Sequence, residues 1–354
     1  MRSPSLVGSV SIVVLYSQVE AIARGEPVDI LAEQETALVA REIWAGLQSL
    51  GYRVALAGVT HDVAPALALY DPGEWLVFNL CESPGGDPSL EATVPLLLEA
   101  LGFLYTGSRA ATLTACLDKA GAKERLTAHG LPTPRYAVLS SPDQPCDVPL
   151  PALVKPVSED ASVGISNDSV VREPGALARQ VAYVLERYRQ PALVEEFIAG
   201  REFNVAIWGH DPPEPLPIAE ICYQGFDDPL QRLLTYESKW VPDSYAYSHT
   251  PGVCPAQVEP ELEERLASTA LAAYQLMGCQ GYARVDLRER DGVPHILEVN
   301  PNPSLASDAG FARAARAAGF DHAHMAERIA GFALGRAPVS CGLGARAVAE
   351  PEVK

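Results

Sequence analysis

The chain has 354 residues, more than one hydrophobic core usually organises, so two or three domains are expected. Its 48% hydrophobic and 20% charged residues are typical of a folded globular protein and exclude a disordered or fibrous chain. The formal net charge of -18 disfavours nucleic acid and anionic membranes as partners. A nucleotide remains compatible, because local lysines, backbone N–H groups and Mg²⁺ overcome a distant acidic surface.

The N-terminal region shows no membrane or secretion signal. Its longest apolar run, from Val10 to Tyr16, is too short to cross a bilayer, and no signal-peptide pattern precedes it. The seven cysteines are widely spaced, and no two are close enough for a zinc knuckle or a redox dithiol. We therefore expect a cytoplasmic protein with reduced thiols.

Strand and helix signals alternate over the first hundred residues. Apolar residues at spacings of three and four predict a helix near residues 31–50, which Gly51 ends. A second helix is expected near residues 90–101, and strands are expected over residues 11–16, 53–57 and 75–80. This alternation indicates an open α/β sheet.

A second α/β unit follows. Helices are expected near residues 115–129 and 175–189, strands over 134–139, 152–157 and 192–197, and a surface loop over 140–151. A third group of signals predicts strands over 203–208, 217–223, 282–288 and 295–300, a helix near 260–277 and two short helices up to 334. Residues 236–247 are aromatic and without clear period, so either a lid or a structural loop is expected there.

The most informative segments are two neighbouring strand candidates with polar residues two apart. Arg284 and Asp286 share one face of the first strand, and Glu298 and Asn300 share one face of the second. Carboxylate and amide oxygens are ligands that Mg²⁺ favours, so Asp286, Glu298 and Asn300 are candidate metal ligands. A cross-strand ion pair between Arg284 and a carboxylate is the structural alternative.

A lysine at the end of an apolar strand precedes a Ser/Gly loop. The ammonium of Lys155 and the loop around Ser162 and Gly164 can together contact phosphate oxygens. The segment is not a Walker A loop, because the Gly-x4-Gly-Lys-Ser/Thr order is missing. A tight hairpin is the alternative.

Acidic residues lie at the end of another predicted strand and after it. Glu195 and Glu196 are near the end of the strand, and Glu202 follows seven residues after Glu195. Main-chain N–H and C=O groups at this strand end can read an adenine, and a carboxylate can accept hydrogen bonds from a ribose. These acids are equally consistent with a solvated surface.

The order of these segments resembles the ATP-grasp superfamily, and in particular its D-alanine–D-alanine ligase branch. The likeness runs from about Asn79 to Phe320 and includes four further motifs in family order: Tyr105-Thr-Gly-Ser108, Cys116-Leu-Asp-Lys119, Pro132-Thr-Pro134 and Tyr236-Glu-Ser-Lys239. It implies an α/β (α+β) ATP-grasp fold of three domains. These are an N-terminal Rossmann-like pre-ATP-grasp domain (1–108), a central subdomain (109–197) and a C-terminal subdomain (198–335), followed by a loose tail (336–354).

The resemblance also implies residue roles. Lys119 and Lys155 contact the nucleotide phosphates, Glu195 the adenine amino group, the main chain of Ile198 the ring and Glu202 the ribose. Lys239 contacts the transferred phosphate, and Arg284 stabilises the tetrahedral intermediate. Asp286, Glu298 and Asn300 hold two Mg²⁺ ions, with Mn²⁺ as an alternative; ATP and the metal are the expected cofactors.

The amino-acid half departs from the family pattern. The family's N-terminal Gly-Gly-x-Ser-x-Glu segment has no counterpart, and several family pocket positions are changed. The candidate substrate-pocket residues are Cys81, Glu82, Ala161, Trp240, Ser304 and Asp308, with Ala309 beside them.

Three functional hypotheses follow. The first is an ADP-forming carboxylate-amine ligase that works through an acyl phosphate on amino-acid or peptide-type substrates other than D-alanine. The alternative is a genuine D-alanine–D-alanine ligase of peptidoglycan precursor synthesis. The third is a non-catalytic nucleotide-binding or carrier-docking module, which the complete set of lysines and metal ligands argues against. The expected partners are small-molecule carboxylates and amines, and a homodimer is expected from symmetry statistics.

Overall fold

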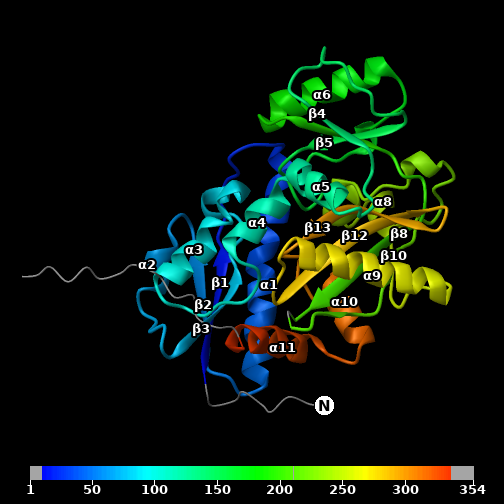
Figure 1. Ribbon diagram of the computed structural model, residues 1–354. Coiled ribbons are helices and arrows are strands. Elements are labelled where there is room, and N and C mark those ends of the chain that lie inside the picture. Colours follow the sequence, from blue (N-terminus) through cyan, green and yellow to red (C-terminus); the bar gives the residue numbers. More distant parts are fainter. Residues whose placement is uncertain (1–9, 210, 336–354) are drawn as a thin grey trace, which may run out of the picture.

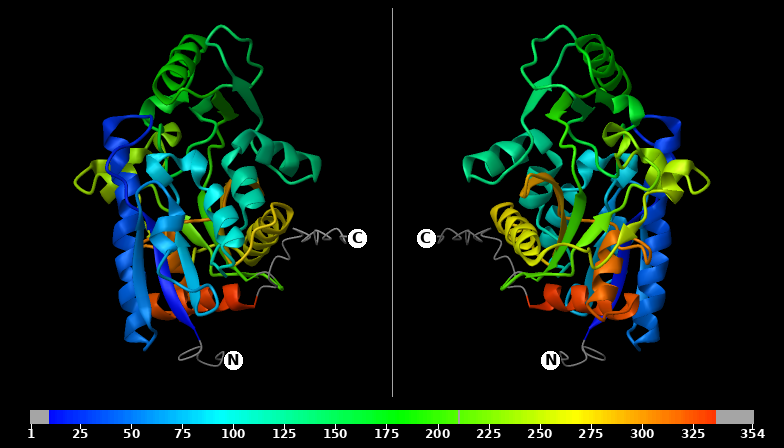
Figure 2. Two further views of the ribbon diagram at one scale, coloured as in Figure 1. Left: turned by 90° about the vertical axis from the view of Figure 1, so that its left-hand side faces the viewer. Right: turned by 90° about the vertical axis from the view of Figure 1, so that its right-hand side faces the viewer.

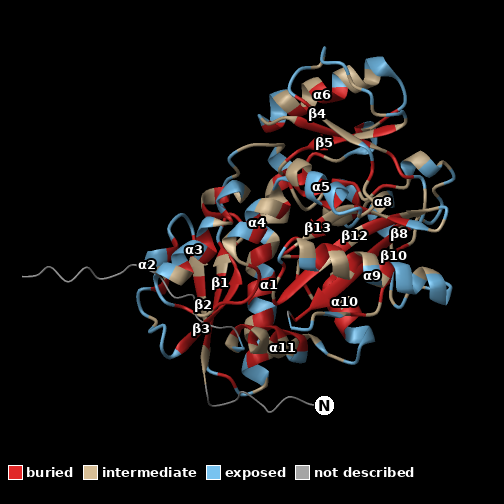
Figure 3. Ribbon diagram, in the orientation of Figure 1, coloured by how far each residue is buried: buried red, intermediate tan, exposed pale blue. Residues whose placement is uncertain are grey.

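The computed structural model describes residues 10–209 and 211–335, and the chain forms three sheets with helices on their outer faces (Figure 1). Figure 3 shows that buried residues concentrate on the strands and on the helix faces that cover them. No helix in the described ranges is long and apolar enough to cross a membrane. The tail expected from residue 336 onward lies outside the described residues.

The first sheet is parallel, with strand order β2-β1-β3. Its strands are β1 (Ser11–Ser17), β2 (Val54–Val59) and β3 (Trp75–Leu80). Helices α1 (Ile30–Ser49), α2 (Val63–Leu67) and α3 (Thr93–Ala100) connect and follow them. β3 is buried along its whole length, as expected for an apolar strand covered on both faces. The carboxyl ends of parallel strands lie at one edge of a sheet. At this edge, the segment that follows β3 lines the cavity described below.

The second sheet is antiparallel, with order β4-β7-β5-β6. Its strands are β4 (Tyr136–Leu139), β5 (Ala152–Pro156), β6 (Val170–Val171) and β7 (Ala192–Glu196). Its apolar side chains share one core with α6 (Pro174–Tyr188). The unit caps one end of the molecule, at the top of Figure 1 and in both views of Figure 2.

The third and largest sheet has the order β11-β10-β8-β12-β13, with β9 paired to β8. Its strands are β8 (Glu202–Trp208), β9 (Glu214–Pro215), β10 (Ala219–Ile221), β11 (Gly252–Val253), β12 (Tyr282–Arg290) and β13 (Val293–Asn300). The accompanying helices are α7 (Tyr236–Trp240), α8 (Tyr245–Ser248), α9 (Pro260–Leu276), α10 (Gly310–Ala317) and α11 (His322–Leu334). Short 3-10 helices occupy Pro27–Asp29, Pro84–Gly86, Pro88–Leu90, Asn167–Ser169 and Pro229–Gln231.

One hydrophobic core joins the first sheet to the C-terminal helices. Ile43 and Leu47 of α1 share a core cluster with Met325 and Ile329 of α11, and all four side chains are fully buried. The boundaries at 108, 197 and 335 therefore remain a proposal, since α11 packs with the N-terminal unit rather than with the C-terminal sheet alone.

The helix predicted over residues 115–129 is wrong as a single element. The chain forms α4 (Ala110–Leu117) and α5 (Lys119–Ala128), and the helical path breaks at Asp118. The Asp118 carboxylate accepts a hydrogen bond of 3.1 Å from the Gly121 N–H, so Asp118 caps the second helix. The irregular stretch predicted over 236–247 contains the two short helices α7 and α8.

Candidate active site

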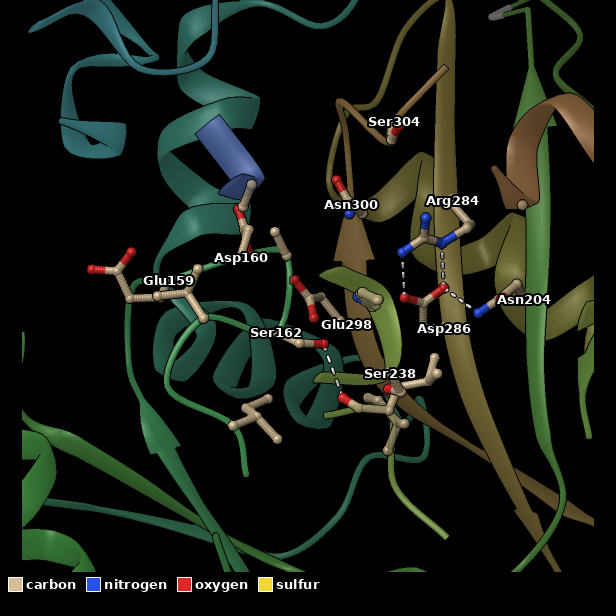
Figure 4. Close-up of a pocket in the computed structure, with 18 of the residues that line it drawn as sticks. Glu159, Asp160, Ser162, Asn204, Ser238, Arg284, Asp286, Glu298, Asn300 and Ser304 are labelled. Carbon is tan, nitrogen blue, oxygen red and sulfur yellow. Dashed lines mark hydrogen bonds and ion pairs between the residues drawn. The ribbon is translucent and has the colours of Figure 1, made fainter. Parts of the chain in front are cut away.

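A cavity of about 680 Å³ lies where the three sheets meet. Its wall comes from the start of α1, the chain after β3, the loop after β5, the end of β7, α7, and strands β12 and β13. Figure 4 shows acidic, basic and amide side chains from these segments facing one another across it.

The two strands predicted to carry metal ligands are adjacent and in register. Asp286 pairs with Glu298, and Arg284 pairs with Asn300, so the four side chains share one face of the sheet. Arg284 forms a two-point ion pair with Asp286, at 2.7 and 2.8 Å, and Asn204 donates to Asp286 at 2.7 Å (Figure 4). The ion pair therefore forms within β12, rather than across the strands as the alternative interpretation expected.

Lys119 connects this face to the loop after β5. Its ammonium lies 3.1 Å from Glu298 and 2.5 Å from Asp160. Burial opposes ionisation of Glu298, but the charge of Lys119 and a hydrogen bond from Asp160 outweigh it and lower the pKa of Glu298. Burial and the charge of Glu298 raise the pKa of Asp160 to about 6 despite the nearby ammonium.

A buried triad of two lysines and one carboxylate joins α5, β5 and β7, and two of its members, Lys155 and Glu195, line the cavity. Glu195 is 2.7 Å from Lys155 and 2.5 Å from Lys123, and Lys123 also donates to the Thr133 hydroxyl at 2.8 Å. Burial disfavours the Glu195 charge, but the two ammonium groups outweigh it and hold the pKa of Glu195 below its ordinary value. Two cations share one anion here, and the surplus positive charge suits a polyphosphate.

The side chain of Arg288 contacts both Glu202 and the main chain of Ile198. Arg288 is 2.7 Å from the Glu202 carboxylate and donates to the Ile198 carbonyl at 3.0 Å, and the Tyr223 hydroxyl donates to Glu202 at 2.7 Å. The solvated-surface interpretation is wrong for these acids, because Glu195 is 2% and Glu202 is 6% exposed. Glu196 pairs with Arg290 at 2.6 Å.

Lys239 is the cation without a partner in this region. It lies on α7 and lines the cavity, and it forms no ion pair within the described ranges. Burial and the nearby charge of Arg284 lower its pKa. An unpaired ammonium beside Arg284 can receive an incoming anion.

The loop after β5 is fastened to the segment that carries Lys239. Ser162 donates to the Leu234 carbonyl at 2.9 Å, and the Trp240 indole donates to the Ala161 carbonyl at 3.0 Å. Ala161 and Ser162 have positive φ values of 54° and 62°, a backbone region that non-glycine residues adopt mostly at ligand clamps and tight turns. The tight-hairpin interpretation is wrong, since β6 begins only at Val170.

Comparison with known proteins identifies the family. The family model for the D-ala D-ala ligase C-terminus matches residues 126–330. The D-alanine–D-alanine ligase of Desulforudis audaxviator is 35% identical over 315 residues, covering 86% of this chain and 96% of the relative. An uncharacterised protein of Sinorhizobium fredii, y4sG, is 33% identical over 295 residues, covering 81% and 84%.

The chain belongs to the D-alanine–D-alanine ligase family. It is therefore an ATP-grasp ligase that forms an amide bond. The crystal structure of the D-alanine–D-alanine ligase from Bacillus anthracis complexed with ATP matches with a TM-score of 0.70 at 23% identity, covering 92% of this chain and 97% of that chain. The predicted ATP-grasp fold is thus confirmed.

The substrate-pocket residues predicted from this family resemblance are largely brought together. Glu82, Ala161, Trp240, Ser304, Asp308 and Ala309 all line the cavity. Cys81 does not: it is fully buried in the core beside the first sheet, where burial raises the pKa of its thiol to about 12. The prediction for Cys81 followed from alignment to a family position, but at this position the chain directs a small apolar side chain into the core.

The sequence-based reasoning missed several residues of the site. Glu33 and Glu35 at the start of α1, and Glu91 after β3, also line the cavity; Lys123 and Asn204 complete the networks around Glu195 and Asp286. Lys123 lies four residues after Lys119 on α5, so the helical period could have indicated it. Glu33 and Glu35 thus bring carboxylates into the cavity from the first helix, although the family's N-terminal glutamate motif has no counterpart in the sequence.

The candidate metal ligands combine carboxylate and amide oxygens. No group of three or more His, Cys, Asp or Glu side chains within residues 10–209 and 211–335 is placed to hold a metal ion. Asp286, Glu298 and the amide of Asn300 are nevertheless hard oxygen donors on one face, and such a set fits Mg²⁺ when phosphate oxygens complete the coordination.

Proposed function

We propose that this chain couples ATP hydrolysis to ligation of two amino-acid-type substrates through an acyl phosphate. The observation that carries the proposal is the β12–β13 register, which sets Arg284 and Asp286 beside Asn300 and Glu298 in the cavity that also contains Lys155 and Lys239. One cavity therefore contains both the cations that bind a phosphoryl group and the carboxylates that bind a metal ion.

The nucleotide half is assigned from the buried networks. Lys119 and Lys155 bind the phosphates, with Lys123 holding the Glu195 carboxylate in place. Glu195 and the Ile198 main chain face the adenine, Glu202 the ribose, and Ser162 with its loop covers the phosphates. Lys119 and Lys155 must partly exchange their carboxylate partners for phosphate oxygens, which is a replacement of one ion pair by another.

Asp286, Glu298 and Asn300 would hold Mg²⁺ ions. The metal would supply charge neutralisation and alignment of the phosphate oxygens. Asn204 keeps the Asp286 carboxylate oriented through its 2.7 Å hydrogen bond. Mn²⁺ suits the same oxygen donors.

The chemistry proceeds in two balanced steps. The substrate carboxylate attacks the terminal phosphorus of ATP, so that an acyl phosphate forms and ADP leaves. A neutral amine then attacks the acyl carbon, the amide bond forms, and the departing phosphate takes the amine proton as HPO₄²⁻. Lys239 is placed to bind the transferred phosphoryl group, and Arg284 to stabilise the oxyanion of the tetrahedral intermediate.

The proposal also names the amino acids that are ligated. Relatives of this chain are named D-alanine–D-alanine ligases, which favours the alternative hypothesis over a substrate other than D-alanine. D-alanine is therefore the first substrate to test. A cytoplasmic location and a homodimer remain predictions.

An isotope experiment tests the ligation itself. Purified protein with Mg²⁺, ATP and amino acids whose carboxylates contain ¹⁸O should release one ADP and one phosphate per amide, with one ¹⁸O transferred to the phosphate. Release of AMP, or phosphate without ¹⁸O, would refute the acyl phosphate. Binding of ATP without any ADP formation across the amino-acid panel would favour the non-catalytic module.

A further inference from the structure

Four glutamates of the N-terminal unit line the cavity. Glu33 and Glu35 come from the start of α1, and Glu82 and Glu91 come from the chain between β3 and α3. We call these residues the glutamate cluster. All belong to the N-terminal unit, so the fold brings two separate segments to one wall of the active site.

The glutamate cluster differs from most other acids of the cavity in its partners. Asp286, Glu298, Glu195 and Glu202 each lie within 3.1 Å of a lysine or arginine. No member of the cluster forms an ion pair with a cation in the described part of the chain; the charge of Lys239 reaches only Glu35. The carboxyl groups of the cluster thus lack a protein counter-charge.

The neutral partners of the cluster leave oxygen atoms available. Ser83 donates to Glu33, Ser304 donates to Glu35 at 3.0 Å, and Asn302 donates to one oxygen of Glu91 at 3.0 Å. The second oxygen of Glu91, which is 8% exposed, accepts no hydrogen bond from the described residues. Glu82 likewise has no hydrogen-bond partner among them.

This arrangement disfavours the ionised form of the buried carboxyl groups. Burial and the neighbouring Glu91 and Glu33 raise the pKa of Glu82 well above its ordinary value, and burial raises the pKa of Glu91 to about 8. A carboxylate that is buried without a counter-charge is stabilised when a cation enters beside it. The unused oxygens of Glu82 and Glu91 are the acceptors that such a cation requires.

We infer that the glutamate cluster binds a substrate with two cationic groups: a diamino acid or guanidino acid in place of a neutral amino acid. This inference rests on the proposed ligation and names the substrate class of that same cavity. One ammonium of a neutral amino acid matches one carboxylate and leaves the others without a counter-charge. A second ammonium or guanidinium on the side chain neutralises the remainder, while the substrate carboxylate faces Lys239 and Arg284.

Matched amino acids test the inference. Ornithine and norvaline share one carbon skeleton and differ by the side-chain ammonium, as do lysine and norleucine. With the full chain, ATP and Mg²⁺, both enantiomers of each and D-alanine are compared by ADP release and by calorimetric binding. We expect kcat/KM and affinity to favour the diamino acid at least about 10-fold over its neutral match, since each 1.4 kcal/mol is tenfold. Equal values, or a higher value for norvaline or D-alanine, would overturn the inference.

Two readouts separate this inference from the proposed function. Tight binding of ornithine without ADP release would refute ligation and retain the cationic site. ADP release with equal binding of ornithine and norvaline would retain ligation and refute the cationic site. Absence of both binding and turnover would overturn both.

Conservative variants locate the effect. Glu82→Gln and Glu91→Gln keep the side-chain shape and remove one buried charge each, so the fold should be retained. Each should reduce the ornithine-to-norvaline preference about 10-fold. Glu74→Gln is the matched control, because Glu74 is exposed just before β3 and does not line the cavity; it should leave the preference unchanged. An unchanged preference in both cavity variants would contradict the assignment of the cluster.

Discussion

The Trp240 indole donates a 3.0 Å hydrogen bond to the carbonyl oxygen of Ala161, joining segments that are 79 residues apart in the chain. Both residues are among the candidate pocket positions at which the sequence departs from the family pattern. One contact between an indole N–H and the main chain thus connects α7 to the loop after β5, which we propose covers the phosphates.

Removing this hydrogen bond should loosen the loop. Trp240→Phe keeps an aromatic ring but lacks the N–H donor, and a typical hydrogen bond contributes about 0.5–1.5 kcal/mol. We expect the KM for ATP to rise about 3- to 10-fold and hydrogen exchange in residues 158–165 to become faster. Trp44→Phe is the control, since Trp44 donates a similar 3.2 Å bond to Val54 away from the cavity. Equal effects of the two variants on the KM for ATP would argue against a role in the loop.

Lys155→Ala should weaken ATP binding and turnover together. The variant removes one of the cations that we propose bind the phosphates, while Lys123 still neutralises Glu195 at 2.5 Å, so the buried carboxylate stays paired. A hydrogen bond to a charged group contributes about 1.5–3 kcal/mol, which predicts a Kd for ATP about 10- to 100-fold higher. Calorimetry measures this change. Arg179→Ala, at an exposed position of α6, should bind ATP like the wild type; unchanged binding in Lys155→Ala would remove this lysine from the nucleotide site.

The sequence allowed the strands of the site to be predicted because their side-chain pattern is local. The strand predicted over 75–80 has the observed bounds of β3, and the spacing of Arg284, Asp286, Glu298 and Asn300 placed the four on one face. The break at Asp118 was missed because helix-forming residues continue on both sides of it, and only the capping bond to Gly121 separates α4 from α5.

The acidic wall could not be predicted in the same way. Glu33 lies 50 positions before Ser83, and Glu91 lies 211 positions before its partner Asn302. No local period relates these residues, and exposed glutamates at a helix start are common in any chain. The tertiary fold, which places the start of α1 beside the segment between β3 and α3, brings them to one cavity.

Glu298→Gln tests the metal site. The change keeps the side-chain shape but removes one of the two carboxylates from the Asp286, Glu298 and Asn300 set. Activity should fall by at least about 100-fold at saturating ATP, in keeping with the loss of several kcal/mol of metal-dependent stabilisation, and the Mg²⁺ concentration for half-maximal rate should rise. A Mg²⁺ titration of the ADP-release rate measures both effects. Glu237→Gln on the exposed side of α7 serves as control; a near wild-type rate in Glu298→Gln would show that this carboxylate is structural.

The last prediction concerns the pH dependence of stability. The pKa of Glu91 rises from 4.5 to about 8 on folding, chiefly because burial disfavours its charge, with Asp160 and Glu33 adding repulsion. The folded protein therefore binds more protons than the unfolded chain between these values. Stability from this group is fully present below pH 4.5 and is lost as the pH rises toward 8. Glu82, Glu33 and Glu35 act in the same direction, since their pKa values are also raised.

Glu91→Gln should remove much of the stability loss that the wild type shows as the pH rises. The amide oxygen still accepts the hydrogen bond from Asn302, but it has no charge to bury. Relative to the wild type, the variant should gain on the order of 2–4 kcal/mol in the free energy of unfolding between pH 5 and pH 8.5, because one pKa unit corresponds to about 1.4 kcal/mol. Urea denaturation at the two pH values measures the difference, and Glu74→Gln should track the wild type at both. A variant whose advantage is the same at pH 5 and pH 8.5 would mean that Glu91 does not ionise as a buried, uncompensated acid, and the electrostatic argument for a cationic substrate would lose its strongest support.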